Sequence, residues 1–138
     1  MTTIAFKDGL IAYDSRCTQD QTIVDDNHNK KVTVEKVHFF FSGALSDYND
    51  FIESYFGKKP EYKLSCSAFV CDKGKVYKCG VDNEIMFWKV LIEVPASIGS
   101  GQDHAITAMD MGADAKTAVK MAIKRDSGSG GRVRVFKL

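Results

Sequence analysis

The second residue of the chain, Thr2, directly follows the initiator methionine and stands at the start of an expected strand. A threonine hydroxyl attacks a carbonyl only when a base takes its proton, and an N-terminal threonine carries that base in its own α-amine. Met-Thr is a common dipeptide, and a retained Met1 would convert the amine into a peptide nitrogen that is no base. Thr2 is small enough for an aminopeptidase to remove Met1, and we expect no propeptide ahead of it.

Five further blocks of polar and glycine residues follow Thr2, each at the edge of an expected strand or helix. In chain order they are Asp14-Ser15-Arg16-Cys17-Thr18, Lys30-Lys31-Val32, Ser42-Gly43-Ala44, Gly99-Ser100-Gly101 and Arg125-Asp126-Ser127-Gly128-Ser129-Gly130-Gly131. A lone Gly-Ser-Gly is weak evidence, whereas six ordered matches are specific. With Thr2, the set resembles the proteasome β subunits and their bacterial peptidase relatives, members of the N-terminal nucleophile hydrolase superfamily. The resemblance runs from Thr2 to Gly131.

The resemblance implies that Thr2 is the nucleophile and that its α-amine accepts the hydroxyl proton through a water. Lys31 would lie beside Thr2 as a cation, and Asp14 would pair with Lys31. A neighbouring ammonium disfavours protonation of the α-amine, whose ordinary pKa is ~7.7–8.0, so more free base is present at neutral pH. Taken without the other blocks, Asp14 and Lys31 would each be an ordinary solvated surface charge.

The same resemblance assigns supporting roles. Gly43 would offer its backbone N–H to the developing oxyanion, a role compatible with a strand-to-helix turn that needs glycine. Ser100, Asp126 and Ser129 would hydrogen-bond the amine and hydroxyl of Thr2, although both serines could equally be turn residues in glycine-rich loops. The positions that would bind substrate are Cys17, Thr18, Asn29, Thr33, Phe41 and Leu45. We expect the bulky Phe41 to shorten the pocket and to favour small or medium apolar side chains.

Short strands and three helices must position these residues. Expected strands are Thr3–Phe6, Leu10–Asp14, Lys31–Val34, Val37–Ser42, Ser67–Cys71, Lys75–Lys78, a run within Glu84–Val94, and Arg132–Leu138. Expected helices begin near Ser46, span Asp103–Met111, and follow Asp114 as N-cap. The pattern indicates an α+β chain. The resemblance implies a four-layer αββα sandwich of two antiparallel sheets, with a reduced helix layer, as one domain over residues 1–138.

The chain departs from the β-subunit pattern in its middle and at its end. Only 56 residues separate Gly43 from Ser100, one helix is readable there in place of a long pair, and no helix follows the last strand. These differences argue against the stacking of two rings. The apolar run Ile85–Trp88 falls where the second helix would have been, and it is either core or a subunit contact.

Composition narrows the classes of protein. A chain of 138 residues that is 44% hydrophobic fits one folded domain, not a disordered segment. Nineteen Lys and Arg against eighteen Asp and Glu give a net charge of +1, which offers no field to recruit nucleic acid or an anionic membrane. Because neither a signal peptide nor a membrane span is readable, we expect a cytoplasmic protein. The four cysteines lack metal-ligand spacing and are expected to be small buried hydrophobes, with no metal and no cofactor.

The leading hypothesis is a threonine peptidase of the proteasome type that hydrolyses peptide bonds through a Thr2 acyl-enzyme after Met1 is removed. The resemblance implies a peptide or unfolded protein substrate and a homo-oligomeric ring, and it allows an ATP-dependent unfoldase as a partner. One alternative is a non-catalytic proteasome-like subunit that acts in assembly or protein binding. Another is an amidase of the same superfamily acting on a small molecule, which the Arg125–Gly131 block makes less favoured.

Overall fold

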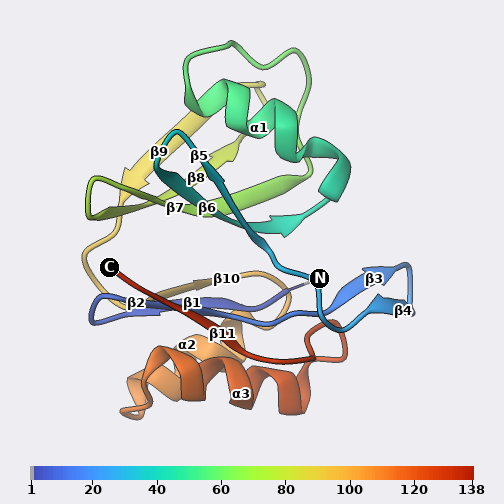
Figure 1. The fold of residues 1–138 in the computed structure, drawn as a ribbon, viewed down its shortest axis with the longest axis vertical. Helices are drawn as coiled ribbons and strands as arrows, with labels where there is room; N and C mark the ends of the chain where they lie inside the picture. Colours follow the sequence, from blue (N-terminus) through green and yellow to red (C-terminus); the bar gives the residue numbers. More distant parts are fainter. Residues whose placement is uncertain (1) are drawn as a thin grey trace. The chain divides into compact units, whose positions relative to one another are not determined.

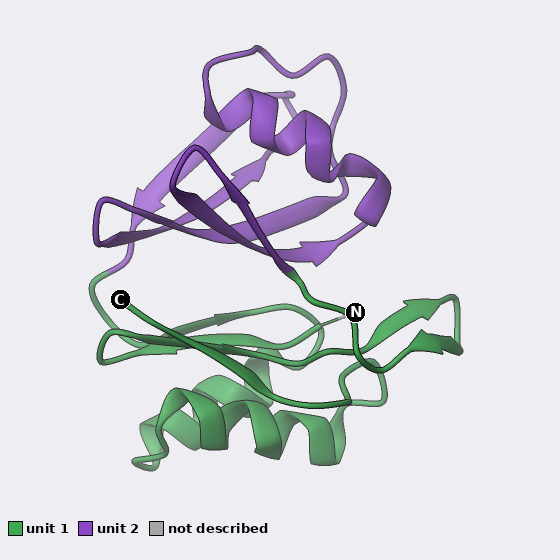
Figure 2. Ribbon diagram, viewed as in Figure 1, with its two compact units in different colours: residues 1–30, 93–138 green, residues 31–92 purple. Residues whose placement is uncertain are grey.

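A computed structural model describes residues 2–138, and within them the chain forms eleven strands, three α-helices and one 3₁₀ turn (Figure 1). Two compact units can be distinguished (Figure 2). The first consists of the chain up to Lys30 together with Glu93–Leu138, and the second consists of Lys31–Ile92. The first unit therefore combines both ends of the sequence, including Thr2 and the blocks around Asp14, Ser100 and Asp126.

The first unit is built on a four-stranded antiparallel sheet in the order β10-β1-β2-β11. Its strands are β1 (Ile4–Lys7), β2 (Leu10–Tyr13), β10 (Ala96–Ile98) and β11 (Arg134–Lys137). The expected hairpin around Asp8-Gly9 is confirmed, and both turn residues adopt positive φ. The last strand is shorter than expected, because regular pairing with β2 begins only at Arg134.

Two helices, α2 (Gln102–Asp110) and α3 (Ala115–Arg125), cover one face of this sheet (Figure 1). The core between them is rich in alanine, with Ala5 and Ala12 from the sheet meeting Ala105, Ala118 and Ala122 from the helices. Small side chains let the helices approach the strands closely. The expected N-cap of α3 is confirmed, since the Asp114 carboxylate accepts a hydrogen bond from the Thr117 N–H at 2.8 Å.

A two-stranded hairpin, β3 (Cys17–Gln19) and β4 (Thr22–Asp25), leaves the first unit beside this sheet (Figure 1). Neither strand was expected, because every residue of β4 is exposed and the segment has no apolar alternation. The base of the hairpin is fixed by the Arg16 guanidinium, which forms two hydrogen bonds to Asp26 at 2.8 and 3.1 Å.

The second unit is a five-stranded antiparallel sheet in the order β5-β6-β7-β8-β9. The strands are β5 (Lys31–Val34), β6 (Val37–Gly43), β7 (Cys66–Asp72), β8 (Lys75–Val81) and β9 (Phe87–Leu91). The turn η1 (Leu45–Asp47) leads into α1 (Tyr48–Tyr55), whose residues Phe51 and Ile52 are buried in the core of this unit. On β6, Phe39 and Phe41 belong to that core, and strand alternation directs Phe40 to the opposite face.

The start of α1 differs from the expectation. Ser46 is not the N-cap, because it lies within the 3₁₀ turn, and the α-helix begins at Tyr48 after Asp47. The Asp47 carboxylate accepts a hydrogen bond from the Ser65 N–H at 2.7 Å and does not cap the helix. At the other end, the Tyr55 hydroxyl donates to Asp72 at 2.6 Å, which ties the helix to the end of β7.

The apolar run Ile85–Trp88 is divided between two environments. Phe87 packs against the core of the second unit, whereas Met86 is 54% exposed. The Trp88 indole lies over Gly80, where a Cβ atom would come within 2.5 Å of the ring. Part of the run, Phe87, therefore belongs with the core, which was one of the two expectations. Met86 lies at the surface.

Candidate active site

Thr2 lies in the first unit with its hydroxyl against a buried ion pair. The Lys30 Nζ atom is 2.8 Å from Thr2 Oγ1 and 2.7 Å from Asp14 Oδ1. The side chains of Lys30 and Asp14 are only 3% and 0% exposed. Lys30 thus contacts both the candidate nucleophile and a carboxylate. A cation in this place favours loss of the proton from the Thr2 hydroxyl.

The prediction that Lys31 fills this place is wrong by one residue. Lys31 is the first residue of β5, pairs with Phe40 and is partly exposed, whereas Lys30 precedes the strand and is buried. Successive side chains of an extended segment point to opposite sides, so one of two adjacent lysines is directed to a given site. The aliphatic Val32 after Lys31 favoured the wrong member of the pair.

Asp14 follows β2 and has each carboxylate oxygen satisfied by two donors. Oδ1 accepts from Lys30 Nζ and from the Thr3 N–H at 3.0 Å. Oδ2 accepts from the backbone N–H groups of Arg16 at 3.2 Å and Gly130 at 2.9 Å. A buried carboxylate is costly without such partners. The four donors keep Asp14 in one orientation and thereby fix the position of the Lys30 ammonium.

Burial lowers the pKa of Lys30, and the charge and hydrogen bond of Asp14 only partly oppose this effect. Lys30 therefore gives up its proton more readily than a solvated lysine does. Its ammonium form donates to Thr2 Oγ1, and its neutral form accepts from the Thr2 hydroxyl, so the same 2.8 Å contact serves both protonation states.

A second carboxylate, that of Asp126, is connected to the backbone nitrogen of Thr2 through a serine. The Ser100 hydroxyl, in the turn between β10 and α2, accepts from Thr2 N at 3.1 Å and donates to Asp126 Oδ2 at 2.6 Å. Burial opposes the ionisation of Asp126, but hydrogen bonds from Ser100, Ser129 and the Gly128 N–H outweigh it. The pKa of Asp126 therefore lies below its ordinary value. Asp126 is thus ionised at neutral pH and acts as an acceptor.

Ser129 reaches Thr3 instead of Thr2. Its hydroxyl is buried, donates to Asp126 Oδ2 at 2.7 Å and lies 2.7 Å from Thr3 Oγ1. Of the three supporting residues expected to bond Thr2, only Ser100 does so directly. Asp126 acts through Ser100, and Ser129 holds the neighbouring residue.

Gly43 and Phe41 belong to the second unit. Gly43 has φ of +116°, and a Cβ atom there would lie 2.2 Å from the Ser65 carbonyl oxygen, so the fold itself requires glycine. Its role as an oxyanion donor stays a prediction. The expectation that Phe41 lines a pocket is wrong, because its ring is fully buried between Tyr48, stacked at 4.0 Å between centroids, and Phe51.

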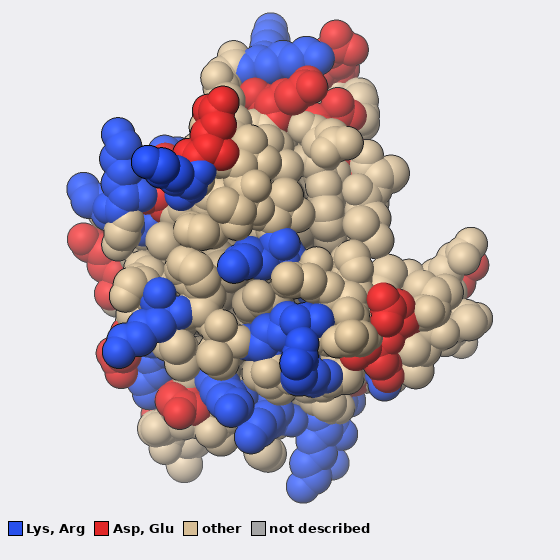
Figure 3. All heavy atoms as spheres, in the orientation of Figure 1, with Lys and Arg blue, Asp and Glu red and all other residues tan. Residues whose placement is uncertain are grey.

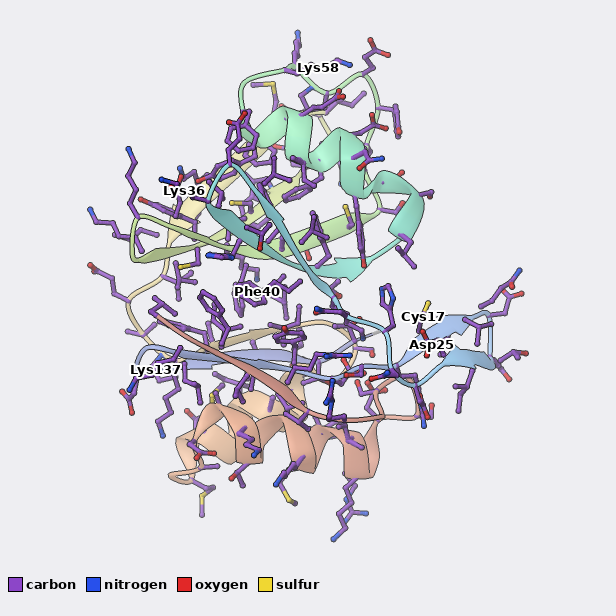
Figure 4. The ribbon with its side chains drawn as sticks, viewed as in Figure 1. Cys17, Asp25, Lys36, Phe40, Lys58 and Lys137 are labelled. Atoms are coloured by element: carbon purple, nitrogen blue, oxygen red, sulfur yellow. The ribbon has the colours of Figure 1, made fainter. Side chains whose placement is uncertain are left out.

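The other expected substrate positions lie on separate elements. Cys17 and Thr18 are on β3, and Figure 4 shows Cys17 and Asp25 on the two strands of the hairpin. Asn29 accepts from the Tyr13 hydroxyl at 3.4 Å, and Thr33 on β5 is 2.9 Å from His38 Nδ1. Leu45 is exposed in η1. Substrate binding by these residues stays a prediction.

Sequence reasoning missed two residues around Thr2. Lys30 carried no signal that set it apart from Lys31, and Thr3 fitted the start of a strand. Elsewhere among residues 2–138, the buried Nε2 atom of His28 has no hydrogen-bond partner within the protein.

The described part of the chain shows no group of three His, Cys, Asp or Glu side chains that could hold a metal ion. All four cysteines are free thiols, and three of them, Cys66, Cys71 and Cys79, are buried as expected. No helix formed by residues 2–138 is both long enough and apolar enough to cross a membrane.

Several solved structures have the same fold. The Thiobacillus denitrificans protein BPH in complex with epoxomicin matches with a TM-score of 0.73 and 16% identity, over 99% of this chain and 97% of that one. BPH on its own matches with a TM-score of 0.70 and 17% identity, over 99% and 96% of the two chains. HslV from Trypanosoma brucei gives 0.70 and 17%, over 99% of each chain.

No family model and no curated protein matches the sequence. The structural matches nevertheless confirm the resemblance at the level of the fold, which this chain shares with BPH and HslV. The expected fold class is also confirmed, with helices and three antiparallel sheets in one mixed chain. At 16–17% identity the matches define the fold, and the chemistry must be argued from the side chains of this chain.

Proposed function

We propose that this protein is a proteasome-like threonine peptidase that cleaves peptide bonds with Thr2 as the nucleophile. The observation that carries the proposal is the two-sided engagement of Thr2. Lys30 Nζ is 2.8 Å from its hydroxyl and Ser100 Oγ is 3.1 Å from its nitrogen. A threonine with a purely structural role needs neither a buried lysine nor a carboxylate-backed serine at these two atoms.

In the proposed reaction, removal of Met1, which lies outside the described residues, frees the α-amine of Thr2. The amine takes the hydroxyl proton as Oγ1 attacks the substrate carbonyl, and Lys30 stabilises the oxygen as it loses that proton. Ser100, backed by Asp126, orients the amine, and the Gly43 N–H receives the oxyanion. When the C–N bond breaks, the protonated Thr2 α-amine returns its proton to the leaving amine, and water then hydrolyses the Thr2 ester to restore the enzyme.

We also propose the setting in which this chemistry operates. The substrate is a peptide or an unfolded protein, the enzyme is a homo-oligomeric ring in the cytoplasm, and an ATP-dependent unfoldase supplies the substrate. The HslV-type fold supports the ring and the substrate class. Epoxomicin, which is bound to BPH in one of the similar structures, is a suitable probe of the site.

A second candidate is a non-catalytic subunit of the same fold. One observation favours it, namely that α1, with eight residues, is the only α-helix in the second unit. A reduced helix layer removes surface that an assembly of two stacked rings would use. The buried Lys30–Asp14 pair against Thr2 has no explanation in this candidate, so we place it second.

The test compares three proteins whose N-termini are verified by intact mass: a Met1-retaining form, a trimmed form, and trimmed Thr2→Ala. Hydrolysis of fluorogenic peptides is the measurement, with epoxomicin binding in parallel. We expect hydrolysis only by the trimmed wild type, because an acylated amine is no base. Equal hydrolysis by the Met1-retaining and trimmed forms would exclude the mechanism, and an inactive trimmed form would favour the non-catalytic subunit.

A further inference from the structure

Thr3, the residue after the candidate nucleophile, is fully buried and has all of its polar atoms bonded. Its N–H donates to Asp14 Oδ1 at 3.0 Å, and its carbonyl accepts from the Asp14 N–H at 3.2 Å. Its hydroxyl lies 2.7 Å from Ser129 Oγ. Continuation of the β1–β2 pairing explains the bond to the Thr3 carbonyl, but it explains neither the bond from the Thr3 N–H to a side-chain carboxylate nor a buried hydroxyl directed at a serine.

The direction of the Thr3–Ser129 bond follows from the number of protons available. Ser129 has one hydroxyl proton, and it donates that proton to Asp126 Oδ2 at 2.7 Å. Asp126 is ionised and can only accept. Ser129 is therefore the acceptor towards Thr3, and the Thr3 hydroxyl is the donor.

Two chains of hydrogen bonds therefore end on the same carboxylate oxygen, Asp126 Oδ2. Thr2 N reaches Asp126 Oδ2 through Ser100, and Thr3 Oγ1 reaches the same oxygen through Ser129. Two successive residues immediately before β1 are thus connected to Asp126 by one serine each. Consecutive hydrogen bonds of this kind polarise and strengthen one another.

Thr3 is also the residue that links the two carboxylates around Thr2. Asp14 places Lys30 against the Thr2 hydroxyl, and Asp126 places Ser100 against the Thr2 nitrogen. Thr3 bonds to Asp14 through its backbone and to Asp126 through Ser129. Resting on the proposed function, we infer that Thr3 is a positioning residue that holds the hydroxyl and the amine of Thr2 in mutual register.

The Thr3 hydroxyl occupies space that is open because residue 101 is glycine. A Cβ atom on Gly101 would lie 1.9 Å from Thr3 Oγ1, so any larger residue at position 101 would displace the hydroxyl. The same turn therefore provides the serine that holds the Thr2 nitrogen and the gap that receives the Thr3 side chain.

The test uses Thr3→Val, which keeps the shape of the side chain and removes the hydroxyl, and Thr3→Ser, which restores it. Ser129 loses only an incoming donor in Thr3→Val, so the protein should still fold, as thermal unfolding will verify. Thr107→Val, on the exposed face of α2, is the matched control. In trimmed protein we expect Thr3→Val to lower kcat about tenfold or more with little change in KM, and Thr3→Ser to recover most of the loss.

A second readout does not depend on turnover. The pH dependence of Thr2 α-amine acylation, followed by the mass of the N-terminal peptide after digestion, titrates the amine separately from the lysines. Loss of the Thr3 donor leaves the Asp126 charge less neutralised, so Thr3→Val should raise the pKa of the amine and Thr107→Val should not. If the trimmed wild type cleaves no peptide, the proposed function fails while this titration still decides the role of Thr3. Thr3→Val with wild-type kcat, where activity exists, and a wild-type amine titration would overturn the inference.

Discussion

Lys30 is the side chain on which the chemistry of Thr2 depends most directly. It is buried, its Nζ atom contacts both the Thr2 hydroxyl and Asp14, and burial lowers its pKa. A buried ammonium is costly unless it is paired, and it becomes useful when a reaction creates negative charge beside it. Loss of the hydroxyl proton places developing negative charge on Thr2 Oγ1, 2.8 Å from Nζ.

The adjacent lysines provide a matched pair of variants. We expect Lys30→Ala to lower peptidase activity roughly 10²–10⁴-fold, because it removes the group that assists proton transfer at Thr2, and Lys31→Ala to stay within about twofold of wild type. Lys30→Arg keeps the charge but introduces a larger planar group, so it should be nearly as damaging as Lys30→Ala. The measurement is hydrolysis of a fluorogenic peptide by trimmed protein.

Stability separates a catalytic loss from a folding failure in this comparison. Removing Lys30 leaves Asp14 with three backbone donors, and breaking a buried ion pair typically costs about 3–5 kcal/mol, so a lower thermal midpoint is expected. Activity is therefore compared below the midpoint of each variant. A Lys31→Ala protein that is inactive while Lys30→Ala remains active would show that the assignment of Lys30 is wrong.

At the scale of elements, β7 and β8 bury three of the four thiols. Burial raises the pKa of Cys66 and Cys79 to about 12 and also raises that of Cys71. Cys17 lies instead on β3, half-buried, in the hairpin outside both larger sheets. The thiolate is the reactive form of cysteine. Burial in β7 and β8 therefore lowers the reactivity of these thiols in two ways, by limiting the access of reagents and by disfavouring the thiolate.

Thiol alkylation measures this difference. With iodoacetamide at pH 8, we expect one rapid adduct on the folded protein, at Cys17, and four adducts in denaturant, counted by intact mass and located by peptide mapping. Cys17→Ser should abolish the rapid adduct, and Cys71→Ser should leave it unchanged. Rapid native labelling of Cys66 or Cys79 would contradict the buried strands of the second unit.

Some elements could be predicted from the sequence because a local signal agreed with the tertiary environment. Asp8-Gly9 specifies a hairpin, the spacing of Tyr48, Phe51 and Ile52 specifies a helix face, and Asp114 caps α3 with its side-chain carboxylate. β4 and β10 could not be predicted, since β4 has no buried residue and β10 has three residues directly after Pro95. β4 pairs with the neighbouring β3 in a hairpin that lies outside the larger sheets, whereas β10 pairs with β1, which is distant in sequence.

The site was predictable in its composition and only partly in its connections. The blocks around Asp14, Ser100 and Asp126 do meet at Thr2, because each stands where a strand or helix of the first unit ends. The choice between Lys30 and Lys31 depends on where β5 begins, which a one-residue shift reverses. The contact between Ser129 and Thr3 depends on the path of a glycine-rich loop, which no periodicity records.

At the scale of the whole molecule, surface charge does not select a partner. Basic and acidic side chains both occur on the face shown in Figure 3, consistent with a net charge of +1. Association must therefore depend on local surfaces. Strand β4 of the β3–β4 hairpin is one such surface, because Ile23 and Val24 are 48% and 53% exposed on successive positions, so both faces of β4 carry an unpacked apolar side chain.

This hairpin is held firmly enough to serve as a contact between copies. Arg16 grips Asp26 with two bonds and also donates to the Ser127 carbonyl at 3.1 Å. Arg134 on β11 donates to the Asn27 carbonyl at 3.2 Å and to its side chain at 3.0 Å. Surface ion pairs add little stability, but bidentate geometry fixes direction. Because these contacts already hold the hairpin in place, its exposed apolar strand β4 loses little conformational entropy when it binds another copy.

We therefore predict that the protein is a homo-oligomer assembled through this hairpin. Light scattering at micromolar concentration should give a mass several times 15.3 kDa for the wild type. Ile23→Asp combined with Val24→Asp should shift the mass towards the monomer, because charged side chains on β4 oppose burial of this strand in an interface. Met111→Asp, a similar change at a side chain that is 85% exposed between α2 and α3, is the control and should leave the mass unchanged. A wild-type protein that is monomeric at this concentration would remove the homo-oligomeric ring from the proposal and favour the non-catalytic candidate.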